Sequence, residues 1–236
     1  MDLLLMPVSF AGHAITFIKH GGFLAKCDRG VNRMTDPIVV NKILQPQNLT
    51  LDFYTKLMYQ KQTREFMKTE IVKILGLKPY VKLPIRHQIT GNCSWANVEA
   101  SVPTMLYMLL FEKANDTKAI KGIVKQVMTF YTVWKEWDKD RSIEDCLDGF
   151  DQMTPNRRKS KASLLGIIFF QASDPKNPRD VKRAQKMMEI LKKPEYHFVL
   201  RSYINVFIKS GKGGARGKMF HELLKACGMS PSDFNY

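Results

Sequence analysis

The stretch that decides the fold of the first part of the chain reads HAITFIKHGGFLAKCD, residues 13–28. β-Branched and aromatic residues are frequent on both sides of Gly21-Gly22, and this glycine pair suits a two-residue hairpin turn. We therefore predict a β-hairpin with strands at about residues 12–19 and 23–28.

The predicted hairpin brings two titratable side chains together. A two-residue loop places His20 opposite Phe23 and Ile15 opposite Asp28. Because side chains alternate along a strand, His13 shares a face with Ile15 and becomes a diagonal neighbour of Asp28, at about 7–8 Å between backbones. A three-residue loop would turn Asp28 to the other face. The register thus brings within reach a hydrogen bond that would fix the imidazole tautomer and leave its second nitrogen able to accept a proton. A strand histidine and an exposed turn aspartate are the alternative.

A candidate nucleophile lies where a loop enters a second predicted element. We expect an apolar helix that begins near Cys93, contains Pro103 and extends to about Lys113. A helix N-terminus stabilises a thiolate, which is the attacking form of cysteine. Gln88 lies five positions earlier, and its amide could form an oxyanion hole with the Cys93 backbone N–H. A buried structural cysteine is the alternative.

The ordered set His13, Asp28, Gln88 and Cys93 resembles the superfamily of adenain, the SUMO proteases and YopJ. The resemblance spans roughly residues 10–113. It implies a thiol peptidase or isopeptidase, with ubiquitin-like modifiers or host proteins as substrates, or alternatively a YopJ-like acyltransferase. Bacterial effectors delivered into eukaryotic cells include similarly diverged members. Cys93 would attack the acyl carbonyl, His13 would act as base and then acid, Asp28 would orient the imidazole, and Gln88 would bind the oxyanion.

The sequence also departs from that family's pattern. Gln88 precedes Cys93 by five positions rather than the usual six, and Asn92-Cys93-Ser94 replaces Asp-Cys-Gly. His13-Ala14 replaces the family's His-Trp. These departures motivate a hypothesis from another class, in which a protease-like scaffold binds host proteins or nucleic acid through a basic surface.

The remaining histidines suggest one further arrangement. Gln88, Cys93 and the nearby Trp95 faintly resemble papain, and in that order His197 and Asn205 would be the partners of the thiol. The apolar pattern around His197 is also typical of a helix facing the core, and the same holds for His221. His20 is expected in the turn, whereas His87 flanks the site.

The second half of the chain is predicted to be helical. Helical patterns cover residues 120–137, 179–192, 197–208 and 218–227, and one or two helices are also expected in the first half, at residues 48–75. We therefore expect an α+β protein with a catalytic core at residues 1–115 and a helical region at 116–236 that provides a substrate or partner surface. The aromatic residues Phe130, Tyr131, Trp134 and Trp137 are expected to face the core, with a partner-binding surface as the alternative.

Lys and Arg outnumber Asp and Glu by 37 to 22, which favours polyanions and acidic protein surfaces as partners. Residues 157–161 and 211–218 are basic, and we expect the second stretch to be a flexible loop. By resemblance to YopJ-like enzymes, these patches would hold an inositol phosphate or another polyanion. Nucleic-acid binding is a weaker hypothesis, because no recognised module is present.

Four cysteines scattered singly indicate a reducing compartment, such as the cytoplasm or the interior of a host cell after secretion. No closely spaced Cys or His pair suggests a metal, and no cofactor is expected. The longest apolar run is too short for a membrane span, and the first residues lack the features of a secretory signal.

Overall fold

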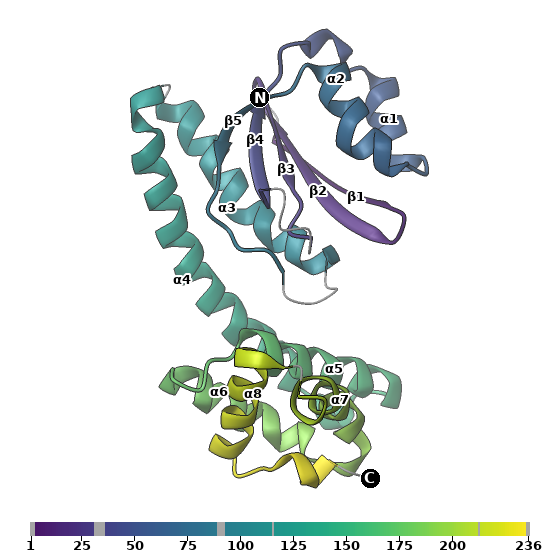
Figure 1. Ribbon diagram of the computed structural model, residues 1–236, viewed down its shortest axis with the longest axis vertical. Coiled ribbons are helices and arrows are strands. Elements are labelled where there is room, and N and C mark those ends of the chain that lie inside the picture. Colours follow the sequence, from purple (N-terminus) through teal and green to yellow (C-terminus); the bar gives the residue numbers. More distant parts are fainter. Residues whose placement is uncertain (1–2, 31–35, 89–92, 115, 212, 235–236) are drawn as a thin grey trace. The chain divides into compact units, whose positions relative to one another are not determined.

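The computed structural model describes residues 3–30, 36–88, 93–114, 116–211 and 213–234, without the side chains of Ser94 and Ala172. The α+β class predicted from the sequence is confirmed, with strands near the N-terminus and helices in the C-terminal half (Figure 1). The strands are β1 (Leu4–Phe10), β2 (His13–His20), β3 (Phe23–Cys27), β4 (Ile38–Lys42) and β5 (Lys78–Lys82). The α-helices are α1 (Leu51–Tyr59), α2 (Ile71–Leu75), α3 (Cys93–Ala114), α4 (Ile120–Leu147), α5 (Pro155–Ala172), α6 (Pro178–Leu191), α7 (His197–Tyr203) and α8 (Gly214–Ala226). A π-helical segment, Phe66–Glu70, leads into α2, and another, Ile204–Lys209, extends α7.

The strands form one antiparallel sheet in the order β1-β2-β3-β4-β5. In the central hairpin His20 pairs with Phe23 and Thr16 with Cys27, so the predicted register is confirmed. The sequence analysis missed β1, β4 and β5. β1 pairs with β2 across a second two-residue turn, Ala11-Gly12, whose positive φ angles suit a hairpin, so this local signal was present and not used. β4 and β5 pair with residues that lie farther away in the sequence.

Helices cover both faces of this sheet, as Figure 1 shows for the first part of the chain. On one face, Ile15 and Phe17 of β2 pack in a cluster with Phe53 and Leu57 of α1. On the other face lies α3, which contacts β2, β3 and β4. Strand β2 is therefore buried from both sides over residues 15–18, which explains its almost uninterrupted apolar sequence.

The chain divides into two compact units, Met1–Val133 and Trp134–Tyr236, and α4 belongs to both. The predicted domain boundary after residue 115 stays a prediction. The second unit has its own core, in which Leu165, Phe169, Leu200 and Leu224 are fully buried.

A buried arginine joins α4 to α6 within the second unit. Arg183 donates to Asp140 at 2.6 Å, to Glu136 at 2.6 Å and to Asp180 at 2.7 Å. Three carboxylates satisfy the guanidinium, as a buried charge requires.

Two expectations for the helices are wrong. The stretch expected to form a flexible loop is partly helical, because α8 begins at Gly214, and Gly217 packs against the carbonyl of Phe207 where a Cβ would lie 2.1 Å away. The aromatic residues of α4 are not all in the core: Tyr131 is buried, but Phe130 and Trp137 are exposed. In the described part of the chain, no helix combines the length and apolar character needed to cross a bilayer.

We predict that Gly166→Ala destabilises the protein. A Cβ on this α5 residue would lie 2.1 Å from Cγ1 of Val199 in α7, so the helices would have to separate. Such overpacking typically costs about 1–3 kcal/mol. The control is Gly122→Ala at an exposed position of α4, where a Cβ meets nothing within 4 Å. This substitution should stabilise the protein by about 0.5–1 kcal/mol. Urea denaturation of both variants checks the prediction, and equal effects would contradict it.

Candidate active site

The β2–β3 hairpin stops pairing just where the candidate catalytic residues begin. Its last backbone pair joins Thr16 to Cys27. Continued two residues further, the same register would pair Ala14 with Arg29, the residues that follow His13 and Asp28. In the described structure, Ala14 and Arg29 instead form hydrogen bonds with other parts of the first unit.

Ala14 and Arg29, which the continued register would pair, are called the opened pair. Residues of α3 and of the segment before it form hydrogen bonds with the backbone groups of this pair. The Ala14 N–H donates to Cys93 Sγ over 3.3 Å, and the Ala14 carbonyl accepts from Asn97 Nδ2 at 2.5 Å. The Arg29 N–H donates to Asn97 Oδ1 at 2.7 Å, and the Arg29 carbonyl accepts from the Gln88 N–H at 2.8 Å. All four backbone groups are therefore satisfied, and the opening brings the backbones or side chains of Gln88 and Cys93 to one end of β2.

The predicted contact between His13 and Asp28 is present, with 2.8 Å between Nε2 and Oδ1. An ionised carboxylate only accepts hydrogen bonds, so Nε2 carries the proton. Nδ1 is then the nitrogen that can accept one. The ring also packs edge-on against Phe10, with centroids 5.5 Å apart.

The electrostatics around Asp28 favour its ionised form. Burial alone would raise the pKa of the carboxyl, but the hydrogen bond from His13, the charge of Lys26 and the N–H of Gly30 together lower it below its ordinary value. Gly30 also lies directly over the pair, because a Cβ there would approach Asp28 Oδ1 and His13 Cε1 to 3.0 Å. Asp28 is therefore an anion at neutral pH, as a residue that orients an imidazole should be.

Cys93 differs in its surroundings from the other cysteines. It is the first residue of α3, where the helix dipole favours a thiolate. It is partly exposed, as Cys227 also is, whereas Cys27 and Cys146 are buried. Burial raises the pKa of Cys27 to about 12 and that of Cys227 to about 11, and it also raises the pKa of Cys146. These three thiols are protonated at neutral pH and are poor nucleophiles.

Gln88 is attached to the site by its backbone. Its side-chain Oε1 is buried and has no hydrogen-bond partner among the described residues. Residues 89–92, which include the predicted loop and Asn92, lie outside the described residues, and so does the side chain of Ser94. The oxyanion-hole role of Gln88 stays a prediction.

The other histidines have defined surroundings. His87 Nδ1 donates to the Gly30 carbonyl at 2.7 Å, so His87 flanks the site as predicted. His20 is not simply a turn residue: it is buried and binds Glu112 at 2.7 Å.

The papain-like arrangement receives no support from the surroundings of its proposed base. His197 is buried in the second unit, donates Nε2–H to the Lys192 carbonyl at 2.8 Å and packs against Phe234. Asn205 is exposed. The imidazole of His197 thus serves the helical core.

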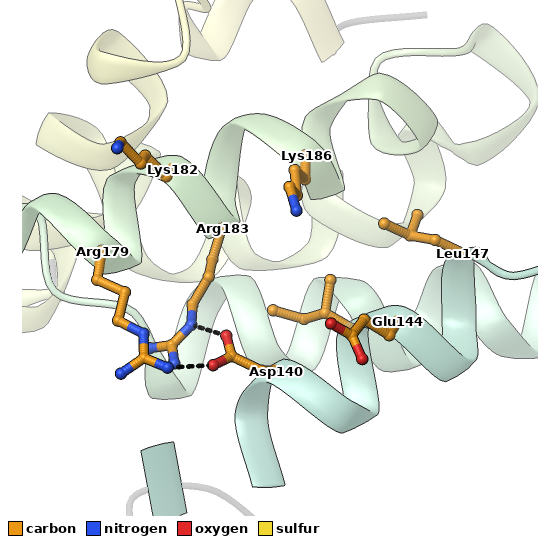
Figure 2. Close-up of a pocket in the computed structure, with 8 residues that line it drawn as sticks. Asp140, Glu144, Leu147, Arg179, Lys182, Arg183 and Lys186 are labelled. Atoms are coloured by element: carbon orange, nitrogen blue, oxygen red, sulfur yellow. Dashed lines mark hydrogen bonds and ion pairs between the residues drawn. The ribbon is translucent and has the colours of Figure 1, made fainter. Parts of the chain in front are cut away.

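The basic patches contain cations that are already engaged. Lys161 pairs with Asp145. The guanidinium of Arg216 stacks over Phe170 at 5.2 Å, but its Nε and Nη2 are buried and have no hydrogen-bond partner among the described residues. A pocket of about 200 Å³ between α4 and α6 is lined by acidic, basic and apolar side chains. Within this lining, Asp140 forms ion pairs with Arg179 and Arg183 (Figure 2). This mixture of signs does not favour a polyanion. Among the described residues, no group of three or more His, Cys, Asp or Glu could hold a metal.

Sequence reasoning missed the residues that hold the site together. Asn97 is fully buried. Arg29 donates to Glu99 at 2.8 Å and to the Ala96 carbonyl at 3.3 Å, and Tyr131 also donates to Glu99 at 2.8 Å. The sequence signal that could have found Asn97 is a polar residue in an apolar helix, four positions and thus about one turn after Cys93.

Comparisons with known proteins place this chain beside a bacterial effector. No protein-family model and no curated protein matches the chain. Among solved structures, the Legionella effector AnkH matches with a TM-score of 0.65 and 34% sequence identity. The match covers 97% of this chain and 48% of that structure, so the chain spans about half its length. The chain is thus similar to one part of a bacterial effector.

We predict that iodoacetamide at pH 7 modifies Cys93 selectively. The thiol of Cys227, whose pKa is raised to about 11, is ionised in only about one molecule in 10,000 at this pH. Peptide mass spectrometry of the alkylated protein measures the site, and Cys93→Ala should abolish rapid modification. Equal labelling of Cys146 or Cys227 in the folded protein would contradict the prediction.

We also predict that Asp28→Asn lowers stability in a pH-dependent way. Because the pKa of Asp28 is lower in the folded protein than in the unfolded chain, its stabilising effect is fully present above about pH 4–5 and is lost as the pH falls through the folded value. The variant should therefore be less stable than the wild type by about 1 kcal/mol at pH 7, and the difference should shrink below about pH 4. Urea denaturation across this range tests the sign. A difference that grows on acidification is the contrary outcome.

Proposed function

We propose that this chain is the thiol-hydrolase part of a bacterial effector, a cysteine peptidase or isopeptidase that acts on proteins of a host cell. The observation that carries the proposal is the opened hairpin, in which the sulfur of Cys93 lies 3.3 Å from the amide nitrogen next to His13, while His13 binds Asp28 at 2.8 Å. The order of these residues resembles that of the adenain, SUMO-protease and YopJ superfamily.

The proposed reaction begins with proton transfer from the Cys93 thiol to Nδ1 of His13, whose Nε2–H is held by Asp28. The thiolate attacks the acyl carbon and forms a tetrahedral intermediate. Its oxyanion would bind the Cys93 N–H and the Gln88 amide. His13 then protonates the leaving amine, and a thioester remains on Cys93. Water, deprotonated by His13, hydrolyses the thioester and restores the thiol.

Transfer of the acyl group to an amine is the alternative outcome of the same intermediate. The residues of the site serve both reactions, because the acceptor is selected by access to the thioester rather than by the base or nucleophile. A YopJ-like acyltransferase therefore remains the second candidate.

The proposal of a host-cell substrate rests on the similarity to AnkH, a Legionella effector. The interior of a host cell is also a reducing compartment, which suits a reactive thiol and cysteines that form no disulfide in the described structure. The net charge of +15 favours acidic protein surfaces as partners.

The test is covalent capture by ubiquitin or a SUMO protein that carries a C-terminal propargylamide. The alkyne accepts a thiol and would trap Cys93. Cys93→Ala should abolish capture, and His13→Ala should slow it by about 100-fold or more, because the general base is lost. A general alkylating probe, iodoacetamide, is applied in parallel to detect a reactive thiol with a different specificity.

His197→Ala is the matched control, because it removes an imidazole from the second unit. The variant should retain capture or alkylation at the wild-type rate once folding has been verified by thermal melting. Loss with His197→Ala but not with His13→Ala would favour the papain-like order. Alkylation of Cys93 no faster than that of glutathione would favour the binding scaffold instead.

A further inference from the structure

Asn97 occupies the place of a backbone pair. It is fully buried, four residues after Cys93 on α3, and therefore lies one helical turn further along the same side of the helix. Its Nδ2 donates to the Ala14 carbonyl, and its Oδ1 accepts from the Arg29 N–H. In a continued antiparallel ladder, that carbonyl and that N–H would be facing partners.

The chemistry of the two partners requires a side chain that both donates and accepts, as an amide does. A carbonyl only accepts and an N–H only donates, so the bridging side chain must present one donor and one acceptor. Asn does this within the span of a single planar group. An aspartate retains the acceptor for Arg29 but, when ionised, has no donor for Ala14.

The bridge also determines where the nucleophile meets the base. Ala14 is bound to α3 at both of its polar groups, by Cys93 Sγ at its N–H and by Asn97 at its carbonyl. Because Ala14 follows His13 directly, the position of the imidazole relative to the sulfur depends on these two contacts.

We propose that Asn97 is a positioning residue that keeps the β2–β3 hairpin open and thereby holds the imidazole of His13 beside the thiol of Cys93. This inference rests on the proposed function. Without the amide, Ala14 and Arg29 are free to pair with each other, which would close the hairpin and withdraw His13 from α3.

The structure separates this role from general stability. Arg29 keeps a second attachment to α3 through Glu99 and the Ala96 carbonyl, so the loop that carries Asp28 stays in place when Asn97 changes. Ser101 offers a matched control. It is buried on the same helix, and its hydroxyl donates to the Val98 carbonyl rather than to Ala14 or Arg29.

The experiment measures the rate of Cys93 alkylation by iodoacetamide between pH 5 and pH 9, in the full chain, relative to glutathione. The wild type should exceed glutathione at least tenfold at pH 6, because His13 removes the thiol proton. Asn97→Ala and Asn97→Asp should lose most of this advantage at pH 6 and converge with the wild type at pH 9. Ser101→Ala should keep the wild-type profile, and thermal melting verifies that each variant is folded.

The outcomes distinguish the two proposals. If the wild type has no advantage over glutathione at pH 6, both the proposed function and the role of Asn97 are overturned. If the wild type has that advantage and both Asn97 variants retain it, only the positioning role is wrong. Should Asn97→Ala fail to fold, Asn97→Asp decides alone, because it keeps the hydrogen bond to Arg29. A profile altered as much by Ser101→Ala as by Asn97→Asp would show a merely structural effect and would also overturn the inference.

Discussion

The site depends on one interruption of a β-ladder. Backbone groups in a buried sheet must be hydrogen-bonded, so a hairpin cannot open without substitutes for its lost partners. Here the N–H and carbonyl groups of Ala14 and Arg29 do not pair with each other, and they form hydrogen bonds with Cys93, Asn97 and Gln88 instead. The requirement to satisfy those groups therefore brings two segments of distant sequence together at the end of the strand that carries His13.

The sequence predicts well what is decided locally. The Gly21-Gly22 turn sets the register of the hairpin, and that register, with alternation along the strands, leads to the contact between His13 and Asp28. The helix that begins at Cys93 follows from its apolar composition, although Pro103 lies inside it. These predictions need only nearest neighbours and the period of a strand or helix.

What could not be predicted depends on contacts between distant residues. Asn97 is 83 residues from Ala14 and 68 from Arg29, and nothing near it in the sequence indicates that its amide joins two strands. Strand β5 is likewise defined by pairing with a strand far away in the sequence, β4. Strand β1 is different, because it was missed although the Ala11-Gly12 turn that joins it to β2 is a local feature. Trp137 was expected in the core but is exposed, because an aromatic residue in a helical sequence does not reveal whether another element covers it.

The two units contribute differently to the proposed function. The predicted catalytic residues all belong to the first unit, whereas in the second unit His197 packs in the core and Arg183 binds three carboxylates that join α4 to α6. An imidazole and a guanidinium engaged in this way stabilise helices and are not available to a substrate. Under the proposed function, the chemistry therefore belongs to the opened hairpin and α3, and the helical unit contributes through its surface.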